Sequence, residues 1–338
     1  MPRKLATIRK VESVLPIPDA DNIEVATVDG WEVVVKKGEF AEGDYGVYFE
    51  IDSLLPRVEP FMFLFKGDEE RYRLRTVKLR GQISQGLLLP VDAFQELLGV
   101  YSFTADCMES MGLDLSTPLD VLEYTRPEPK DIHARSNWLG LCPITDEDRV
   151  ENVKREVEKL HGRPWVATVK IDGQSATYLV HPQTGEFHAC SRRQSVKPGE
   201  NQWWKIADSF RIEEFLRTPG NERYAIQGEI YGPGIQKNLL NFPDYCFDVF
   251  DVYDMVEHRY LSYRERHRLV RDRFNEVPVE GYGIYFEETL ADLKEMAKGL
   301  YPGTNNHREG IVVRNADEGP RVSFKVINAD YLLKNPEA

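Results

Sequence analysis

This chain of 338 residues contains few cysteines, no long apolar run and no clustered metal-binding motif. The four cysteines (Cys107, Cys142, Cys190 and Cys246) lie far apart and form no C-x-x-C pair, which argues against a disulfide framework or a zinc site. The histidines show no H-E-x-x-H spacing. No apolar run approaches the roughly 18 residues of a membrane span. We therefore expect free thiols in a reducing, cytoplasmic setting with no membrane contact, although an organelle is not excluded.

Basic residues are also in deficit, since 43 Lys and Arg face 56 Asp and Glu, for a net charge of −13. Such a charge argues against a protein that coats nucleic acid non-specifically, because phosphate binding needs a basic face. One local exception is the stretch RYRLRTVKLRG at 71–81. At strand spacing, Arg71, Arg73 and Arg75 share one face. This face is either a site for phosphates or the charged protection of an edge strand.

The order of the predicted elements indicates an α+β protein of two domains. Residues 1–115 are rich in short strand-like runs separated by glycine turns, which is typical of a small β-barrel. Residues 116–139 carry several prolines and mixed charge, and we interpret them as a linker. Residues 140–338 mix strands with helices. The first of these helices is predicted over 145–162, with Thr145 as its N-cap.

Charged residues interrupt the apolar strands of the second domain. In VATVKIDGQSATYLV (166–180), Lys170 closes a strand-like run, and Asp172-Gly173 predicts a hairpin turn. Glu229 lies in another apolar strand, Glu309 precedes a further one, and Lys325 lies within the last. Buried charges are tolerated when they are paired, bound to metal or functional. We therefore expect these side chains to converge in one cleft lined by sheet.

These segments resemble the motifs of the covalent nucleotidyltransferase superfamily, which contains ligases and mRNA capping enzymes. Motifs I, III, IIIa, IV and V match, in that order, KIDG (170–173), EIYG (229–232), FDVFDV (247–252), EGIVVR (309–314) and SFKV (323–326). The stretch GEIYGPGIQKN (228–238) is most similar to the ATP-dependent RNA ligases. Motif V departs from the K-x-K of many relatives, because Ser323 takes the place of its first lysine.

The resemblance covers nearly the whole chain and implies its architecture. It points to the RNA ligases in which an N-terminal OB-like β-barrel precedes a nucleotidyltransferase (ATP-grasp-like ligase) α+β domain. It also implies a reaction that joins 3′-hydroxyl and 5′-phosphate ends of RNA, at nicks, with ATP and either Mg²⁺ or Mn²⁺. The intermediates would be a covalent lysyl-AMP and an RNA-adenylate.

The resemblance further implies roles for individual residues. Lys170 would be the nucleophile, and Lys325 would neutralise the α-phosphate. An aromatic side chain, either Phe250 or Phe247, would stack on adenine, and either Arg192 or Arg193 would lie near the nucleotide sugar. The nucleotide-binding set is then Arg149, Lys170, Arg192, Glu229, Phe250 and Lys325, and the metal set is Asp172, Glu229 and Glu309.

Three other interpretations compete with an RNA ligase. A DNA ligase and a capping guanylyltransferase share the chemistry, but both carry an OB domain after motif V, and here only residues 326–338 follow Lys325. A non-catalytic RNA-binding OB protein predicts loss of the lysine or of an acidic motif residue, and none is lost. The partners expected for the ligase are RNA ends, in a nicked duplex, bound by a monomer that serves RNA repair.

Overall fold

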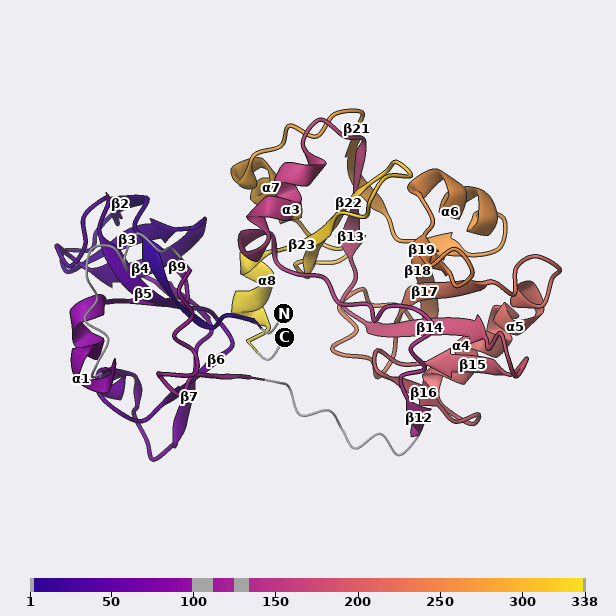
Figure 1. The fold of residues 1–338 in the computed structure, drawn as a ribbon, viewed down its shortest axis with the longest axis horizontal. Coiled ribbons are helices and arrows are strands. Elements are labelled where there is room, and N and C mark those ends of the chain that lie inside the picture. The colour runs from indigo at the N-terminus through magenta and orange to yellow at the C-terminus, as the bar shows by residue number, and fades with distance from the viewer. Residues whose placement is uncertain (1–2, 99–111, 125–133, 337–338) are drawn as a thin grey trace. The chain divides into compact units, whose positions relative to one another are not determined.

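The computed structural model describes residues 3–98, 112–124 and 134–336. The chain divides into two compact units, one of Met1–Glu128 with Leu332–Ala338 and one of Pro129–Tyr331 (Figure 1). Cys107 lies outside the described residues, whereas Cys142, Cys190 and Cys246 are free thiols. Within the described ranges, no helix is long and apolar enough to cross a membrane.

The first unit consists of short antiparallel strands, as its glycine turns predict. Asp29 and Gly30 have φ angles of 49° and 83° and join two paired strands, which fits a two-residue turn. Trp31, Val33 and Val35 alternate inward along the second of these strands. The strands are β1 (Ala6–Lys10), β2 (Ser13–Pro16), β3 (Ile23–Val28), β4 (Trp31–Lys36), β5 (Tyr45–Phe49), β6 (Ser53–Pro56), β7 (Arg71–Arg73), β8 (Thr76–Leu79), β9 (Gln82–Gln85), β10 (Leu87–Pro90) and β11 (Leu122–Glu123).

These strands form several small sheets around one aromatic core. The strand orders are β1-β5-β10, β2-β3-β4 and β11-β6-β7, with β8 paired to β9. Phe49, Phe61 and Phe94 pack ring against ring in the core. Short helices, η1 (Met62–Leu64), η2 (Val91–Phe94) and α1 (Gln95–Leu98), connect or follow the strands. The strand pairings do not by themselves close a barrel among the described residues, although β4 also lies against β9 and β10.

Much of the segment interpreted as a linker is structured. Leu119 and Val121 are buried in the core of the first unit, and β11 pairs with β6. At the other end, β12 (Ala134–Asn137) pairs with a strand of the second unit. Residues 125–133, between these two parts, lie outside the described residues.

The second unit contains two sheets. The larger sheet has the order β12-β16-β15-β14-β17-β18-β19, with β20 on β18, and the smaller has the order β21-β13-β22-β23. Their strands are β13 (Trp165–Lys170), β14 (Gln174–Val180), β15 (Phe187–Cys190), β16 (Gln194–Val196), β17 (Tyr224–Tyr231), β18 (Cys246–Asp254), β19 (Arg259–Tyr260), β20 (Asn275–Glu276), β21 (Val279–Gly283), β22 (Gly310–Asn315) and β23 (Ser323–Ile327).

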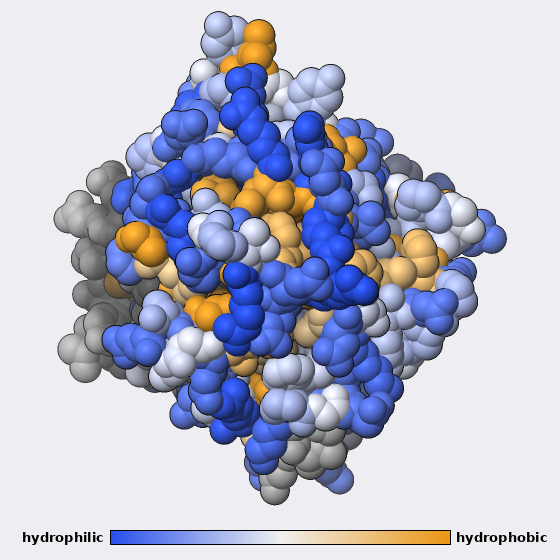
Figure 2. All heavy atoms as spheres, turned by 90° about the vertical axis from the view of Figure 1, so that its right-hand side faces the viewer, coloured by the Kyte–Doolittle hydropathy of each residue, from blue (hydrophilic) through white to orange (hydrophobic). Residues whose placement is uncertain are grey.

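The sheets of the second unit pack against amphipathic helices. Trp203, Ile206 and Ile212 of two helices join the core of the larger sheet. Leu293 and Ala297 of another helix join the core of the smaller sheet. The surface shown in Figure 2 is mainly hydrophilic, with smaller hydrophobic patches. The helices are η3 (Val150–Asn152), α3 (Lys154–Leu160), α4 (Gln202–Ser209), α5 (Ile212–Leu216), α6 (Tyr263–Val270) and α7 (Leu290–Ala297). A last helix, α8 (Ala329–Lys334), begins in the second unit and ends in the first.

The helix predicted over 145–162 is shorter than expected. Only Lys154–Leu160 is α-helical, after a single 3-10 turn at Val150–Asn152. Thr145 is not an N-cap, because the α-helix begins at Lys154 after Val153, and Oγ1 of Thr145 instead lies 2.5 Å from Oγ of Ser175 on β14. The local capping pattern therefore gives way to a contact with the larger sheet.

Candidate active site

Lys170 lies where the chain passes from one sheet to the other. It is the last residue of β13 in the smaller sheet, and the next strand, β14, belongs to the larger sheet. The hairpin predicted around Asp172-Gly173 is therefore wrong, since β13 pairs with β21 and β22 while β14 pairs with β15 and β17. The turn exists, but it joins two sheets and places the lysine at their junction.

The register of β13 and β22 brings Glu309 to Lys170. Gly310 is opposite Lys170 across the two strands, so the residue before it enters the sheet beside the lysine. Nζ of Lys170 donates to Oε2 of Glu309 at 2.8 Å, and both side chains are half-buried. Two residues separated by 139 positions thus form one ion pair at the junction of the sheets.

Two glycines of these motifs allow the strands to approach closely. A Cβ on Gly173 would lie 2.4 Å from the carbonyl oxygen of Ile230 and 2.8 Å from Cγ of Glu229. A Cβ on Gly310 would lie 2.1 Å from the carbonyl oxygen of Val326, and its φ of +149° also disfavours other residues. Both motif glycines therefore serve packing directly beside the charged side chains.

Three carboxylates surround the lysine and set its charge. Burial lowers the pKa of Lys170, but Glu309, Glu229 and Asp172 together raise it above its ordinary value. Burial raises the pKa of Glu229 to about 8, and the carboxylates of Glu309 and Asp172 add to this rise against the opposing effect of Lys170. Lys170 is therefore held as a cation in a crowded acidic site.

A second lysine shows the opposite behaviour. Burial lowers the pKa of Lys325 to about 7, with the nearby cations of Lys170, Arg149 and Arg192 contributing. Arg149 is half-buried and extended, not exposed on a helix, and it forms a parallel bridge with Lys325. The side chain of Arg192 forms an ion pair with Asp146. The predicted cations thus gather in one place, where an anion would neutralise them.

The two aromatic candidates on β18 differ in burial. Phe247 is fully buried in the core of the larger sheet, where its ring meets Tyr178 edge to face at 5.4 Å. Phe250 is only half-buried and packs with Ile171, the second residue of the K-x-D-G motif. Burial therefore favours Phe250 as the ring that can contact a ligand near Lys170.

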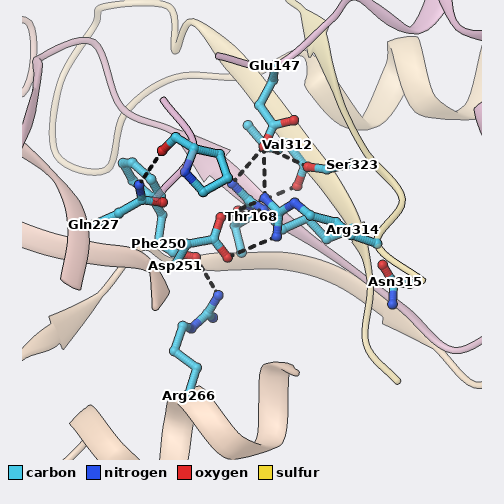
Figure 3. Close-up of polar contacts among 12 residues, drawn as sticks. Glu147, Thr168, Gln227, Phe250, Asp251, Arg266, Val312, Arg314, Asn315 and Ser323 are labelled. Atoms are coloured by element: carbon cyan, nitrogen blue, oxygen red, sulfur yellow. Dashed lines mark hydrogen bonds and ion pairs between the residues drawn. The ribbon is translucent and has the colours of Figure 1, made fainter. Parts of the chain in front are cut away.

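A network of charges connects the two sheets behind Phe250 (Figure 3). Arg314 of β22 contacts Asp251 of β18, with Nε 3.3 Å from Oδ2, and Glu147, with Nη2 3.4 Å from Oε1. Arg321 lies 2.7 Å from Asp251 and 3.2 Å from Glu147. Oγ of Ser323 donates to Oε1 of Glu147 at 2.7 Å. Ser323, the residue at which motif V departs from the family pattern, thus shares Glu147 with two arginines.

Tyr301 was not predicted as a site residue, yet the structure places it against both ends of the ion pair. Its hydroxyl accepts from the backbone N–H of Asp172 at 2.9 Å and of Glu309 at 3.2 Å, and it donates to the carbonyl of Lys170 at 3.0 Å. Tyr331, also buried, hydrogen-bonds to the side chain of Asp172. No motif spacing marks either tyrosine, so no signal in one sequence would have found them.

The predicted metal ligands do not form a ready-made cage. Among the described residues, no group of three or more His, Cys, Asp or Glu side chains is placed to hold a metal ion. Asp172, Glu229 and Glu309 nevertheless lie close enough to interact, because Glu309 and Asp172 add to the rise that burial causes in the pKa of Glu229. Mg²⁺ is usually bound by one or two carboxylates together with water and substrate phosphates. The donor chemistry therefore fits a hydrated ion shared with a phosphate substrate.

The basic strand of the first unit is largely neutralised within that unit. Nη2 of Arg71 lies 2.6 Å from Oδ2 of Asp120, and Nη2 of Arg73 lies 2.8 Å from Oδ1 of Asp52. The guanidinium of Arg73 also stacks on Tyr124 at 3.7 Å. The exposed basic side chains lie farther along, at Arg75 and, in the β8–β9 hairpin, at Lys78 and Arg80.

Two family models match the chain, one in each unit. A model described as an OB-fold domain matches residues 5–91. A model described as RNA ligase matches residues 163–327, which include both sheets' contributions to the site around Lys170.

Solved structures of an RNA ligase from Naegleria gruberi are similar over the whole chain. A mutant of that ligase with AMP and Mn is 33% identical, with a TM-score of 0.84 and coverage of 99% of this chain and 100% of the relative. A second mutant, with ATP and Mn, has the same values. The same ligase with PPi is 33% identical with a TM-score of 0.83, and both chains are fully covered. On this identity and coverage, the chain belongs to the RNA ligase family, as a member in which an OB-fold domain precedes the ligase domain.

Proposed function

We propose that this RNA ligase joins 3′-hydroxyl and 5′-phosphate ends at nicks in duplex RNA, with ATP as the adenylate donor and Lys170 as the nucleophile. The observation that carries the proposal is the placement of Lys170 at the junction of the two sheets, 2.8 Å from Glu309. Lys325 and Arg149 supply positive charge beside it. A free 5′-phosphate has a poor leaving group, so the proposed chemistry first attaches AMP to it.

Three transfers complete the proposed reaction. First, Nζ of Lys170 bonds to the α-phosphorus of ATP, and the bond to pyrophosphate breaks. Next, an oxygen of the RNA 5′-phosphate takes the AMP, and Lys170 leaves as a protonated amine. Finally, the 3′-hydroxyl attacks the activated 5′-phosphorus, which forms the phosphodiester and releases AMP. ATP thus ends as AMP and pyrophosphate.

The first transfer requires a neutral amine at Lys170. At an ordinary pKa, roughly one lysine in a thousand is neutral near pH 7.4. Oε2 of Glu309 is placed to accept the departing proton, because Nζ already donates to it. Lys325, protonated when the anionic nucleotide is bound, would neutralise charge on the α-phosphate. Arg149 would contact the terminal phosphates.

The acidic residues would hold a divalent ion with the substrate. Asp172, Glu229 and Glu309 are the residues we assign to Mg²⁺ or Mn²⁺, through water and phosphate oxygens. When bound, such an ion neutralises phosphate charge and favours the unprotonated form of a nearby amine. Phe250 would stack on adenine, and Arg192 would approach the sugar.

The first unit is proposed to grip the RNA. We assign residues 1–115 to an OB-like barrel, closed where β4 lies against β9 and β10, and residues 140–338 to adenylyl transfer. We assign the phosphate contacts to Arg75, Lys78 and Arg80, because these basic side chains are exposed whereas Arg71 and Arg73 are half-buried. OB folds commonly bind nucleic acid through a basic groove that follows the phosphate backbone.

Self-labelling tests the proposed chemistry. Protein incubated with Mg²⁺ and ATP labelled in its α-phosphate should retain a covalent label on a denaturing gel. Lys170→Ala should abolish the label and leave sealing of RNA that already carries a 5′-adenylate, because that step needs no lysine nucleophile. The matched control is Lys205→Ala, which removes an exposed lysine of α4 and should label normally.

The same assay separates the competing functions. Labelling from GTP in place of ATP would indicate a capping-type guanylyltransferase, and no labelling from either would indicate a non-catalytic binding protein. Preference for nicked DNA over nicked RNA in the sealing assay would indicate a DNA ligase. An adduct that survives Lys170→Ala would remove Lys170 as the nucleophile.

A salt titration tests the proposed grip. Changing Arg75, Lys78 and Arg80 to Gln should weaken RNA binding and flatten its dependence on salt by up to about three phosphate contacts. The control changes Arg211 and Arg217, which are exposed on the second unit and should leave the slope unaltered. An unchanged slope in the triple variant would show that this hairpin does not contact RNA.

A further inference from the structure

We propose that Tyr301 is a positioning residue for adenylylation, which fixes Glu309 and Asp172 relative to Lys170 through a single buried hydroxyl. This inference rests on the proposed function of Lys170. Tyr301 lies outside every motif, and its proposed role is to hold motif I and motif IV at a fixed distance from each other.

The hydroxyl of Tyr301 uses its full bonding capacity at this site. A phenolic hydroxyl donates one hydrogen bond and accepts two. Here it donates to the carbonyl of Lys170 at 3.0 Å and accepts from the N–H groups of Asp172 at 2.9 Å and Glu309 at 3.2 Å. The three partners are backbone groups, so these bonds fix the course of the chain and leave the reactive side chains available.

The bonds of Tyr301 connect segments that are separate in the sequence. Lys170 and Asp172 flank the passage between the sheets, whereas Glu309 directly precedes β22, the neighbour of β13 in the smaller sheet. The turn that contains Glu309 has no backbone bond to Asp172 among those in the described residues, so Tyr301 supplies the connection. Without it, the pairing of β13 with β22 would still keep Glu309 near Lys170, but this hydroxyl would no longer connect the turn of Glu309 to Asp172.

Tyr301 itself is held rigidly enough to serve this purpose. Its side chain is 1% exposed. Its N–H donates to the carbonyl of Asn306 at 3.0 Å, and its carbonyl accepts from Thr304. The neighbouring Arg308 is buried and paired with Glu280 at 2.5 Å. The hydroxyl is therefore presented from a fixed turn.

A second tyrosine supports the same geometry from another element. Tyr331 is 2% exposed and hydrogen-bonds to the carboxylate of Asp172, while Tyr301 holds the backbone of that residue. Loss of the Tyr331 hydroxyl removes its contact to the Asp172 side chain, whereas loss of the Tyr301 hydroxyl removes three bonds to the backbone. We therefore expect a smaller effect from it than from loss of the Tyr301 hydroxyl.

Tyr301→Phe removes the hydroxyl and keeps the ring. Catalytic groups displaced by fractions of an ångström lose much of their rate, so adenylylation of Lys170 should slow at least about tenfold. Sealing of pre-adenylated nicked RNA bypasses the lysine and should fall far less. In saturating ATP titrations, the loss should appear in the maximal labelling rate, with little change in the ATP concentration that gives half of it.

The matched control is Tyr178→Phe. Tyr178 is also fully buried, and its hydroxyl also donates one bond to a backbone carbonyl, that of Trp203 at 2.9 Å, away from the lysine. Tyr178→Phe should leave the rates of self-adenylylation and of sealing pre-adenylated RNA unchanged in the folded protein. If Tyr301→Phe does not fold, Tyr331→Phe decides, because it should slow labelling more than sealing.

Two results would overturn the inference. One is a Tyr301→Phe protein that labels at the wild-type rate. The other is an equal fall in labelling and in sealing of pre-adenylated RNA, which would indicate a general structural role. A wild-type protein that is not labelled by ATP would instead refute the proposed function. Failure of the proposed function is therefore distinguishable from failure of the inference about Tyr301.

Discussion

Replacing each of two phenylalanines on β18 by alanine separates ligand contact from core packing. Phe250 is half-buried beside Ile171 of the lysine motif, whereas Phe247 is fully buried against Tyr178. Stacking of a base on an aromatic ring contributes about 1–3 kcal/mol by alanine substitution. Phe250→Ala should therefore weaken ATP binding by about 5- to 150-fold, since about 1.4 kcal/mol corresponds to tenfold.

Phe247→Ala should have the converse effect. Truncation of a buried phenylalanine lowers the free energy of unfolding by about 3–5 kcal/mol, because a cavity remains. Gly228 already lies against this ring, since a Cβ on that glycine would be only 2.4 Å from it, so the strands cannot close further without a shift. We expect a lower unfolding midpoint and an unchanged affinity for ATP in the folded fraction.

The assay is ATP titration by fluorescence or calorimetry, together with thermal unfolding of each variant. Phe250→Trp keeps an aromatic face and should restore most of the affinity that alanine removes. Wild-type affinity in Phe250→Ala would refute the stacking assignment. Weaker ATP binding by a well-folded Phe247→Ala alone would transfer that assignment to Phe247.

Three further changes test the charged site. Gly173→Ala should displace Glu229 and lower the rate of self-adenylylation at least about tenfold. The free energy of unfolding should fall by about 1–3 kcal/mol. Labelling of this variant at the wild-type rate would show that the close approach of the strands is not needed. Glu229→Ala and Glu309→Ala should each reduce the rate of labelling at least about tenfold. A chelator should abolish labelling of the wild-type protein, and full activity in chelator would refute the assignment of a metal ion to these residues. Because the pKa of Lys325 is about 7, the free protein has this lysine mostly neutral at pH 8, and ATP binding should then take up a proton. Affinity for ATP should accordingly fall as the pH rises above 7, and Lys325→Arg should bind ATP without proton uptake in calorimetry across buffers; unchanged uptake in that variant would assign the proton elsewhere.

The sequence predicted the charged residues of the site but not how they are brought together. Lys170 and Glu309 stand out because each interrupts or precedes an apolar strand. Their contact depends on the pairing of β13 with β22, and a pairing across 139 positions has no local signature. Asp172-Gly173 predicted a turn correctly, but a turn does not specify whether the next strand returns to the same sheet.

Interactions of single side chains were the least predictable part. The spacing of Arg71 and Arg73 placed them on one strand, yet nothing in that spacing revealed that Asp120 and Asp52 would neutralise them. Tyr301 acts through one hydroxyl on backbone groups, which any sequence provides. Such contacts arise from the packed fold, so they become visible only with the structure.

The ion pair of Lys170 with Glu309 also affects which molecules the lysine can react with. Neutral amines combine readily with aldehydes, acyl phosphates and other electrophiles of metabolism, whereas a protonated amine does not. Carboxylates that raise the pKa of Lys170 therefore keep the proposed nucleophile protonated before a nucleotide binds. Reactivity would then be conferred by the nucleotide that enters the site, so that substrate recognition and chemical activation are one event.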